Sequence, residues 1–204
     1  MEPSIKGTVF AGVVEALAKC LAEGRVTEGE LGRWLTPADR AALHEKILVS
    51  NWYPIESYRR INELLRDVVG HGGNEYLREL GRETARKLMA AGIYAQFEYL
   101  QRTEVANAIG AEAKFAAFGR DLRRITTLSS AILNFSKWTA VPDPEHQGGR
   151  YWIEVCDAQH FPEVLAWRSD GLINEMGVAR FGGDMWRWDR PARDRIVFRM
   201  QRDL

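Results

Sequence analysis

Cysteine is scarce in this chain of 204 residues. The two cysteines, Cys20 and Cys156, lie far apart in the sequence. Small secreted domains that depend on disulfides carry several pairs, so this composition excludes a disulfide framework. We expect two free thiols and a cytoplasmic protein.

The chain also lacks an uninterrupted apolar run and an excess of charge of one sign. Residues 1–21 look apolar, but Lys6, Glu15 and Lys19 interrupt them, which excludes a membrane span and a signal peptide there. The 28 lysines and arginines balance 28 aspartates and glutamates, so no global field attracts nucleic acid or an anionic membrane. We therefore expect neither membrane insertion nor nucleic-acid binding.

Motifs of the common enzyme classes are missing from the sequence. It contains no glycine-rich nucleotide or phosphate loop, no paired CxxC, no HExxH and no GxSxG, so these mechanisms lack their anchor residues. In VGHGGNE, His71 stands between glycines as in an esterase oxyanion loop. The stretch separates two predicted helices, which favours a turn. The sequence therefore favours a protein that is not an enzyme.

The chain does show strong hydrophobic periodicity in its first two thirds. A hydrophobic content of 46%, with seven tryptophans and eight phenylalanines, is ample for a core. Apolar residues recur at helical spacing, as in Phe10, Val13, Val14 and Leu17. This pattern predicts a mainly helical part over residues 1–133.

The period changes at about residue 134, where β-branched and aromatic residues alternate with polar ones. FSKWTAV and RYWIEV predict two strands, FPEVLAWRSDGLINEMGVARF predicts a helix with a break near Gly171, and the end of the chain predicts two more strands around DRPARD. The predicted fold is α+β, with a helical part followed by a C-terminal ββαββ antiparallel sheet unit over residues 134–204. We expect one domain over residues 1–204.

The stretch GGDMWRWDRPARDRIVFRM places two tryptophans among arginines. On an alternating strand, Trp186 and Trp188 share one face and Arg187 lies on the other. Nucleic-acid binding by stacking needs exposed rings beside a cationic groove, whereas three aspartates interleave with the arginines here. The pattern favours a structural hairpin.

Aromatic side chains supply the candidate ligand site. We expect Tyr94, Phe97, Trp138 and Trp152 to line a cavity between helices and sheet that accepts a small apolar molecule. The alternative is that these rings fill the core, as aromatic residues at helical or strand spacing commonly do.

A weaker candidate site, for a metal ion, lies around the second predicted strand. Cys156, Asp157 and His160 follow its end, and His146 lies in the preceding turn. A thiolate with imidazoles would suit zinc, but the spacing matches no standard zinc signature. The simpler interpretation is a buried cysteine beside a solvated histidine, so we predict neither a metal nor another cofactor.

Five stretches resemble an uncharacterised bacterial family of about this length that is best represented in myxobacteria. They are IKGTVF, WYPIESYRRINELL, LRELGRETARKL, DGLINEMGVARF and WRWDRPARDRIVFRM, which together span nearly the whole chain. That family is similar in architecture to the haem nitric-oxide-binding domains, to vinyl-reductase-type sensor domains and to small subunits of vesicle-tethering particles. The resemblance implies a ligand sensor or an assembly module, and a homodimer formed through helices.

The same resemblance shows where this sequence departs from those relatives. Haem-binding relatives hold iron through a histidine on a mid-chain helix and the propionates through Tyr-x-Ser-x-Arg, but the matching helix, IYAQFEYLQRTE, has no histidine and the motif is absent. Vinyl-reductase-type sensors often carry several late zinc-binding cysteines, and this chain has only Cys156. Some tethering subunits hold an acyl chain on a buried cysteine, and the resemblance leaves open whether Cys20 is modified.

These observations lead to one main hypothesis and two alternatives. The main one is a non-enzymatic module in signalling or scaffolding that binds a small apolar molecule or a partner protein. The alternatives are a metal-dependent enzyme that uses Cys156, Asp157 and His160, and a haem-type gas sensor with non-standard ligation.

Overall fold

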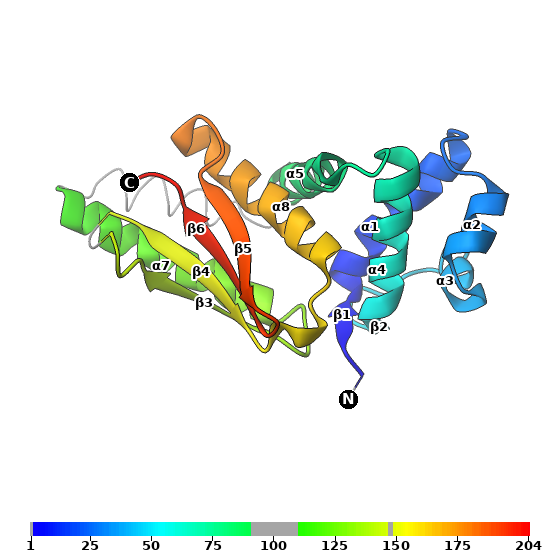
Figure 1. Cartoon of the computed structure of the whole chain (residues 1–204), viewed down its shortest axis with the longest axis horizontal. Coiled ribbons are helices and arrows are strands. Elements are labelled where there is room, and N and C mark those ends of the chain that lie inside the picture. Colours follow the sequence, from blue (N-terminus) through cyan, green and yellow to red (C-terminus); the bar gives the residue numbers. More distant parts are fainter. Residues whose placement is uncertain (1, 91–109, 147–148) are drawn as a thin grey trace. The chain divides into compact units, whose positions relative to one another are not determined.

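The computed structural model describes residues 2–90, 110–146 and 149–204, and its elements carry the labels of Figure 1. The chain divides into two compact units, neither of which is continuous in sequence. The first comprises Met1–Gly81, Ile132–Phe135 and His160–Gly171. The second comprises Arg82–Ala131, Ser136–Gln159 and Leu172–Leu204.

The first unit consists of helices and a small sheet. Its elements are β1 (Ser4–Lys6), α1 (Gly7–Ala22), α2 (Glu28–Trp34), α3 (Pro37–Ala41), β2 (Trp52–Pro54), α4 (Ile55–Leu64), the π-helix η1 (Leu65–Val69) and the start of α5 (Asn74–Ala90). Strand β1 pairs antiparallel with β2. The helical prediction for residues 1–133 is therefore confirmed in part and corrected by this sheet, because strands of three residues are too short to show an alternating pattern.

The predicted apolar face of α1 is buried, with Phe10, Val13 and Leu17 at most 1% exposed. Helices α2 and α3 begin at capping boxes, in which the hydroxyls of Thr27 and Thr36 accept hydrogen bonds from backbone amides three residues later. Local sequence signals therefore position the start of this unit.

Helix α8 (Glu163–Phe181) is continuous through Gly171, where the sequence predicted a break. A Cβ atom at Gly171 would lie 1.9 Å from the carbonyl oxygen of Arg78 in α5. The side chain of Arg78 also reaches α8, where its Nε lies 2.6 Å from Oδ2 of the buried Asp170. The glycine therefore permits close packing of two helix backbones, and the prediction of a break is wrong.

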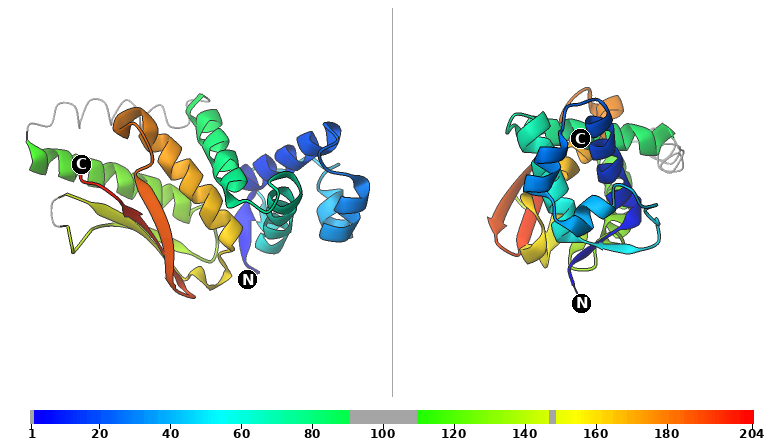
Figure 2. Two further views of the ribbon diagram at one scale, coloured as in Figure 1. Left: turned by 45° about the horizontal axis from the view of Figure 1, so that its top comes forward. Right: turned by 90° about the vertical axis from the view of Figure 1, so that its right-hand side faces the viewer.

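The second unit is built on a four-stranded antiparallel sheet. Its strands are β3 (Lys137–Pro142), β4 (Tyr151–Cys156), β5 (Trp186–Ala192) and β6 (Arg195–Met200), in the spatial order β3-β4-β6-β5. Helix α7 (Ala111–Ser130) runs along one face of the sheet (Figures 1 and 2). The short helix η3 (Ala158–His160) and α8 follow β4 in the chain, so the order of two strands, a helix and two strands is confirmed.

The inner face of the sheet, which is the face toward α7, forms the core of this unit. Its buried members are Trp138, Ala140, Tyr151, Ile153, Val155, Trp186, Ile196, Phe198 and Met200. Phe118 of α7 contacts the rings of Trp186 and Tyr151. Trp186 and Trp188 lie opposite Met200 and Phe198, so the structural hairpin predicted for the end of the chain is confirmed.

The described part of the chain contains no helix that combines the length and the apolar composition of a membrane span.

We expect the two units to unfold together, as the prediction of a single domain requires. The chain passes repeatedly between them, and α5 and α8 each continue without interruption from one unit into the other. Because α5 and α8 each belong to both units, melting of one unit would break helices that the other unit also contains. Scanning calorimetry should show one transition whose calorimetric and van't Hoff enthalpies agree. Two resolved transitions would contradict the prediction.

Candidate functional site

The structure separates the residues predicted to form a ligand wall. Tyr94 and Phe97 lie outside the described residues. Trp138 is paired with Val155 and therefore lies on the inner face of the sheet, whereas Trp152 lies on the opposite face of β4. The two tryptophans cannot line one cavity together, and a ligand-binding role for each remains a prediction.

Trp138 is packed as a core residue. Its side chain is buried, and its ring stacks on Phe198 with the centroids 5.8 Å apart. Its backbone amide donates to the Ser130 hydroxyl at 2.9 Å, which joins β3 to the end of α7. These contacts favour the alternative in which the ring fills the core.

The residues predicted as metal ligands fall in different places. Cys156 is half-buried at the end of β4, and burial, helped by Glu154 and Asp157, raises the pKa of its thiol. Asp157 is exposed and lies 3.6 Å from the Lys137 ammonium. His160 belongs to the first unit, where its exposed ring contacts Phe135 edge-on.

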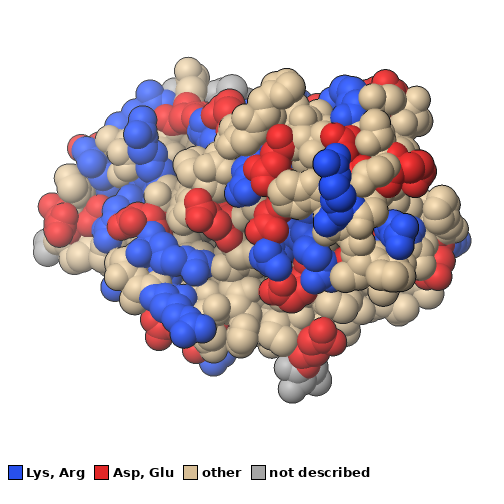
Figure 3. Space-filling model, turned by 45° about the vertical axis from the view of Figure 1, so that its right-hand side comes forward, with Lys and Arg blue, Asp and Glu red and all other residues tan. Residues whose placement is uncertain are grey.

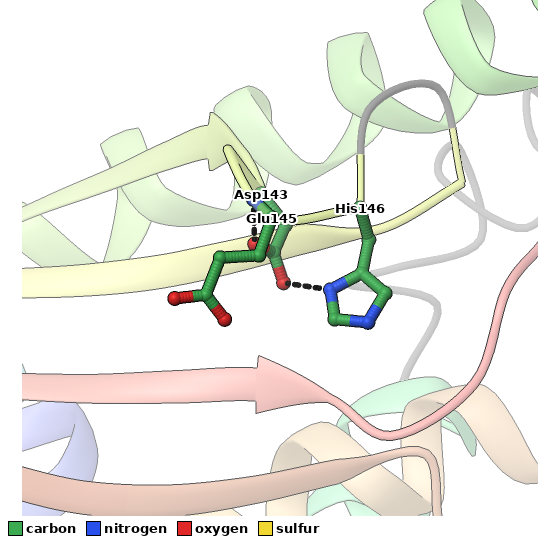
Figure 4. A group of neighbouring side chains, drawn as sticks. All are labelled: Asp143, Glu145 and His146. Atoms are coloured by element: carbon green, nitrogen blue, oxygen red, sulfur yellow. Dashed lines mark hydrogen bonds and ion pairs between the residues drawn. The ribbon is translucent and has the colours of Figure 1, made fainter.

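Among the described residues, metal-ligating atoms meet instead at Asp143, Glu145 and His146, within 4.8 Å of one another. Figure 4 shows Asp143 between the other two side chains. Its Oδ1 accepts from the Glu145 amide at 2.9 Å and its Oδ2 lies 3.2 Å from Nδ1 of His146. Both carboxylate oxygens of Asp143 thus stabilise the turn between β3 and β4. This group brings His146 together with two acidic residues of the segment DPEH, and Cys156 is not part of it. Metal binding by Cys156, Asp157, His160 or His146 remains an alternative that these contacts do not decide.

Histidine is absent from the buried parts of the molecule. The four histidines of the sequence are His44, His71, His146 and His160, and all four are exposed. Cys20, by contrast, is buried in α1, and its Sγ lies 3.7 Å from the Tyr76 hydroxyl. Burial, followed by the interaction with Cys20, raises the pKa of Tyr76 to about 12, so the phenol stays protonated at neutral pH.

The outer face of the sheet, which is the face away from α7, carries aromatic, aliphatic and charged side chains in rows. Alternation and strand register place three rows of side chains across it. They are Val141, Trp152, Arg199 and Arg187; then Thr139, Glu154, Val197 and Asp189; then Lys137, Cys156 and Arg195. Apart from the buried Val197, these side chains are half-buried or exposed. The outer face therefore combines one aromatic ring, aliphatic side chains and several guanidinium groups.

Trp152 is the centre of this face. The guanidinium carbon of Arg199 lies 4.4 Å from its ring centroid and that of Arg195 lies 5.9 Å away. Arg195 also donates to the carboxylate of Glu154. A cation over an indole face is stabilised by about 0.5–1 kcal/mol at an exposed site. Both arginines therefore cover the ring, but among the described residues a carboxylate balances the charge of Arg195 and none balances that of Arg199.

Arg187 and Arg199 lie directly opposite each other on β5 and β6. Neither forms an ion pair with any carboxylate among the residues that the structure describes. Like charges at directly opposed positions destabilise a sheet. On the face of the molecule drawn in Figure 3, basic and acidic side chains are interspersed. Arg187 and Arg199 thus form a like-charged pair on the outer face that no described carboxylate neutralises.

A comparison with solved structures finds H-NOX domains along almost the whole chain. An Fe(II) unliganded H-NOX mutant from K. algicida matches with a TM-score of 0.57 and 9% identity, covering 98% of this chain and 97% of that one. An H-NOX protein from S. oneidensis in the Fe(II)NO ligation state matches with 0.53 and 10%, covering 98% and 100%. A Cs H-NOX mutant matches with 0.55 and 15%, covering 97% and 96%.

No family model and no curated protein matches the chain. The resemblance to haem nitric-oxide-binding domains is confirmed by the structural matches. At these low identities, the likeness establishes the fold, which is the α+β fold of H-NOX domains with its four-stranded antiparallel sheet.

Proposed function

We propose that this chain is a non-enzymatic sensing or scaffolding module of H-NOX fold that acts by binding a partner protein. The observation that carries this proposal is the outer face of the sheet, where Trp152 lies under Arg199, and Arg199 opposes Arg187 with no described carboxylate paired to either arginine. Tryptophan and arginine are the residues most enriched among those that dominate the energy of protein interfaces. The homodimer that the sequence resemblance implies also remains a prediction.

A small apolar ligand is less well supported than a partner protein. Two of the four residues expected to line the cavity lie outside the described residues, and a third, Trp138, packs against Phe198. The fourth, Trp152, lies on the outer face under guanidinium groups rather than in an apolar pocket. Of these four residues, Trp152 is the one whose described surroundings favour recognition at a surface.

The second candidate function is a haem-type gas sensor, and the fold is the observation that favours it. Two of the matched structures are an Fe(II) unliganded H-NOX mutant and an H-NOX protein in the Fe(II)NO ligation state. A haem iron needs an axial ligand from the protein, and the haem-binding family that the sequence resembles is expected to supply it by a histidine on a mid-chain helix. Because all four histidines of this chain are exposed, its residues do not fit a haem held in that way.

A haem titration separates the two functions. We expect the purified full chain to show no saturable Soret band after stoichiometric haem addition, because no buried imidazole is present to bind the iron. The H-NOX protein from S. oneidensis, freed of its haem, serves as the positive control. A one-to-one complex with a Soret band that shifts on addition of nitric oxide would overturn the proposed function and establish the gas sensor.

A further inference from the structure

The geometry of the outer face points to the chemistry of the partner: we propose that the row Val141, Trp152, Arg199 and Arg187 docks a short acidic segment of a partner protein. This inference rests on the proposed function and adds the class of ligand to it. The four residues belong to four adjacent strands and lie side by side across the sheet. Because neighbouring strands are about 4.8 Å apart, the row spans roughly 14 Å.

The row has an apolar end and a cationic end. Val141 and Trp152 form the first on β3 and β4, and Arg199 and Arg187 form the second on β6 and β5. An extended segment lying across the strands can place an apolar side chain against the indole and two carboxylates against the guanidinium groups. Guanidinium groups bind carboxylates in a planar, two-pronged geometry, which makes such contacts strong and specific.

In the free protein, repulsion between the two arginines of this row lowers the stability of the sheet. Arg187 and Arg199 oppose each other, and no described carboxylate neutralises either of them. In the next row, Glu154 pairs with Arg195, and Asp189 accepts from the Arg190 amide at 2.7 Å but forms no ion pair with Arg187 or Arg199. A ligand with two negative charges would remove the repulsion, so part of the binding energy comes from relief of a cost already present in the fold.

The indole of Trp152 gives a second, independent indication that this face binds a ligand with a hydrogen-bond acceptor. Its indole Nε1 is buried and has no hydrogen-bond partner among the described residues. A buried donor without a partner costs free energy, and native proteins rarely leave one unsatisfied. A carboxylate that draws the Arg199 guanidinium away from the ring would give this donor an acceptor.

The same surroundings argue against nucleic acid. A phosphate backbone laid along the sheet would pass the carboxylates of Glu154 and Asp189 in the neighbouring row. The face also offers a single ring, whereas single strands bind along several stacking platforms in a continuous basic groove. Charge complementarity is confined to one row, and a short acidic peptide matches that length.

The test uses two fluorescein-labelled peptides with the full-length chain, Glu-Glu-Phe-Glu-Glu and its glutamine counterpart Gln-Gln-Phe-Gln-Gln. We expect fluorescence anisotropy at low salt to show at least tenfold tighter binding of the acidic peptide, which is about 1.4 kcal/mol. Arg187→Gln and Trp152→Phe should each remove most of this preference. Arg40→Gln, which removes one exposed arginine of the first unit, should leave it unchanged.

The melting temperature of the free protein tests the repulsion between Arg187 and Arg199 without any peptide. Because Arg187→Gln ends the repulsion with Arg199, the melting temperature of the free variant should rise, whereas Arg40→Gln should not raise it. Equal binding of the two peptides, tighter binding of a single-stranded DNA of the same charge, or a lower melting temperature of Arg187→Gln would each overturn the inference. Failure here with no haem binding rejects only the acidic ligand, whereas a haem complex rejects the proposed function itself.

Discussion

Replacing Gly171 by alanine should destabilise the protein by about 3 kcal/mol, at the upper end of what overpacking usually costs. The added methyl carbon would lie 1.9 Å from the carbonyl oxygen of Arg78 and 2.7 Å from its carbonyl carbon, both of which are backbone atoms. A flexible side chain could turn away, but here helix α8 must move from α5. Urea unfolding followed by circular dichroism measures the loss, which should also lower the melting temperature by about 6–12 °C.

Gly12 provides the matched control, because it lies inside α1 with no atom within 4 Å of a Cβ added to it. Gly12→Ala should stabilise the protein by about 0.5–1 kcal/mol, since alanine loses less backbone entropy in a helix than glycine. If Gly171→Ala behaved like Gly12→Ala, the close approach of α5 and α8 would be disproved.

Asp39→Asn should cost the second largest amount, about 2–3 kcal/mol. The Asp39 carboxylate is buried and accepts from the Arg60 guanidinium at 2.7 and 3.0 Å, and from the Thr36 amide and hydroxyl. Breaking a buried ion pair typically costs about 3–5 kcal/mol. We expect less here because the Arg60 side chain is 25% exposed and regains water. Urea midpoints of the variant and the wild-type chain at pH 7 measure the difference.

The same carboxylate makes stability depend on pH. Burial alone would raise the pKa of Asp39, but hydrogen bonds from Arg60, Ser57 and Thr36 outweigh it and hold the pKa well below its usual range. The contribution is therefore complete above the pKa of an unfolded aspartate, about 3.9, and is lost as the pH falls below it. Wild-type stability should drop more steeply than that of Asp39→Asn between about pH 5 and about pH 2.5. Parallel pH profiles would contradict this assignment.

Elements with strong local signals were predictable from the sequence. The buried face of α1 follows from the spacing of Phe10, Val13 and Leu17, and the start of α2 follows from the capping residue Thr27. The four strands of the large sheet follow from alternation and from the turns between them. In each case, a few neighbouring residues determine the conformation.

Features that depend on distant contacts were not predictable. Strands β1 and β2 exist because two short segments pair across about fifty residues, and no periodicity can show over three residues. Gly171 looks like a helix stop unless the backbone of Arg78 is known to lie against it. The sequence therefore indicated a glycine of structural importance but not the reason for it.

The candidate site shows the same limit. Alternation alone places Arg187 on the face opposite Trp186, but its position opposite Arg199 depends on the register of β5 and β6. That register shifts between Asp189 and Ala192, where the hairpin is irregular. Trp138 and Trp152 also looked equivalent as aromatic residues of neighbouring strands, and only the pairing of β3 with β4 separates their faces.

The side chain of Asn174 covers part of the edge of the large sheet. Asn174 of α8 is fully buried, and its amide donates to the carbonyl of Trp186 and accepts from the backbone amides of Met185 and Trp186. It thus occupies the hydrogen-bonding positions that another strand would take at the start of the edge strand β5. These two amides should exchange with deuterium as slowly as those of interior strands, and this end of the sheet is closed to strand addition and the aggregation that follows from it.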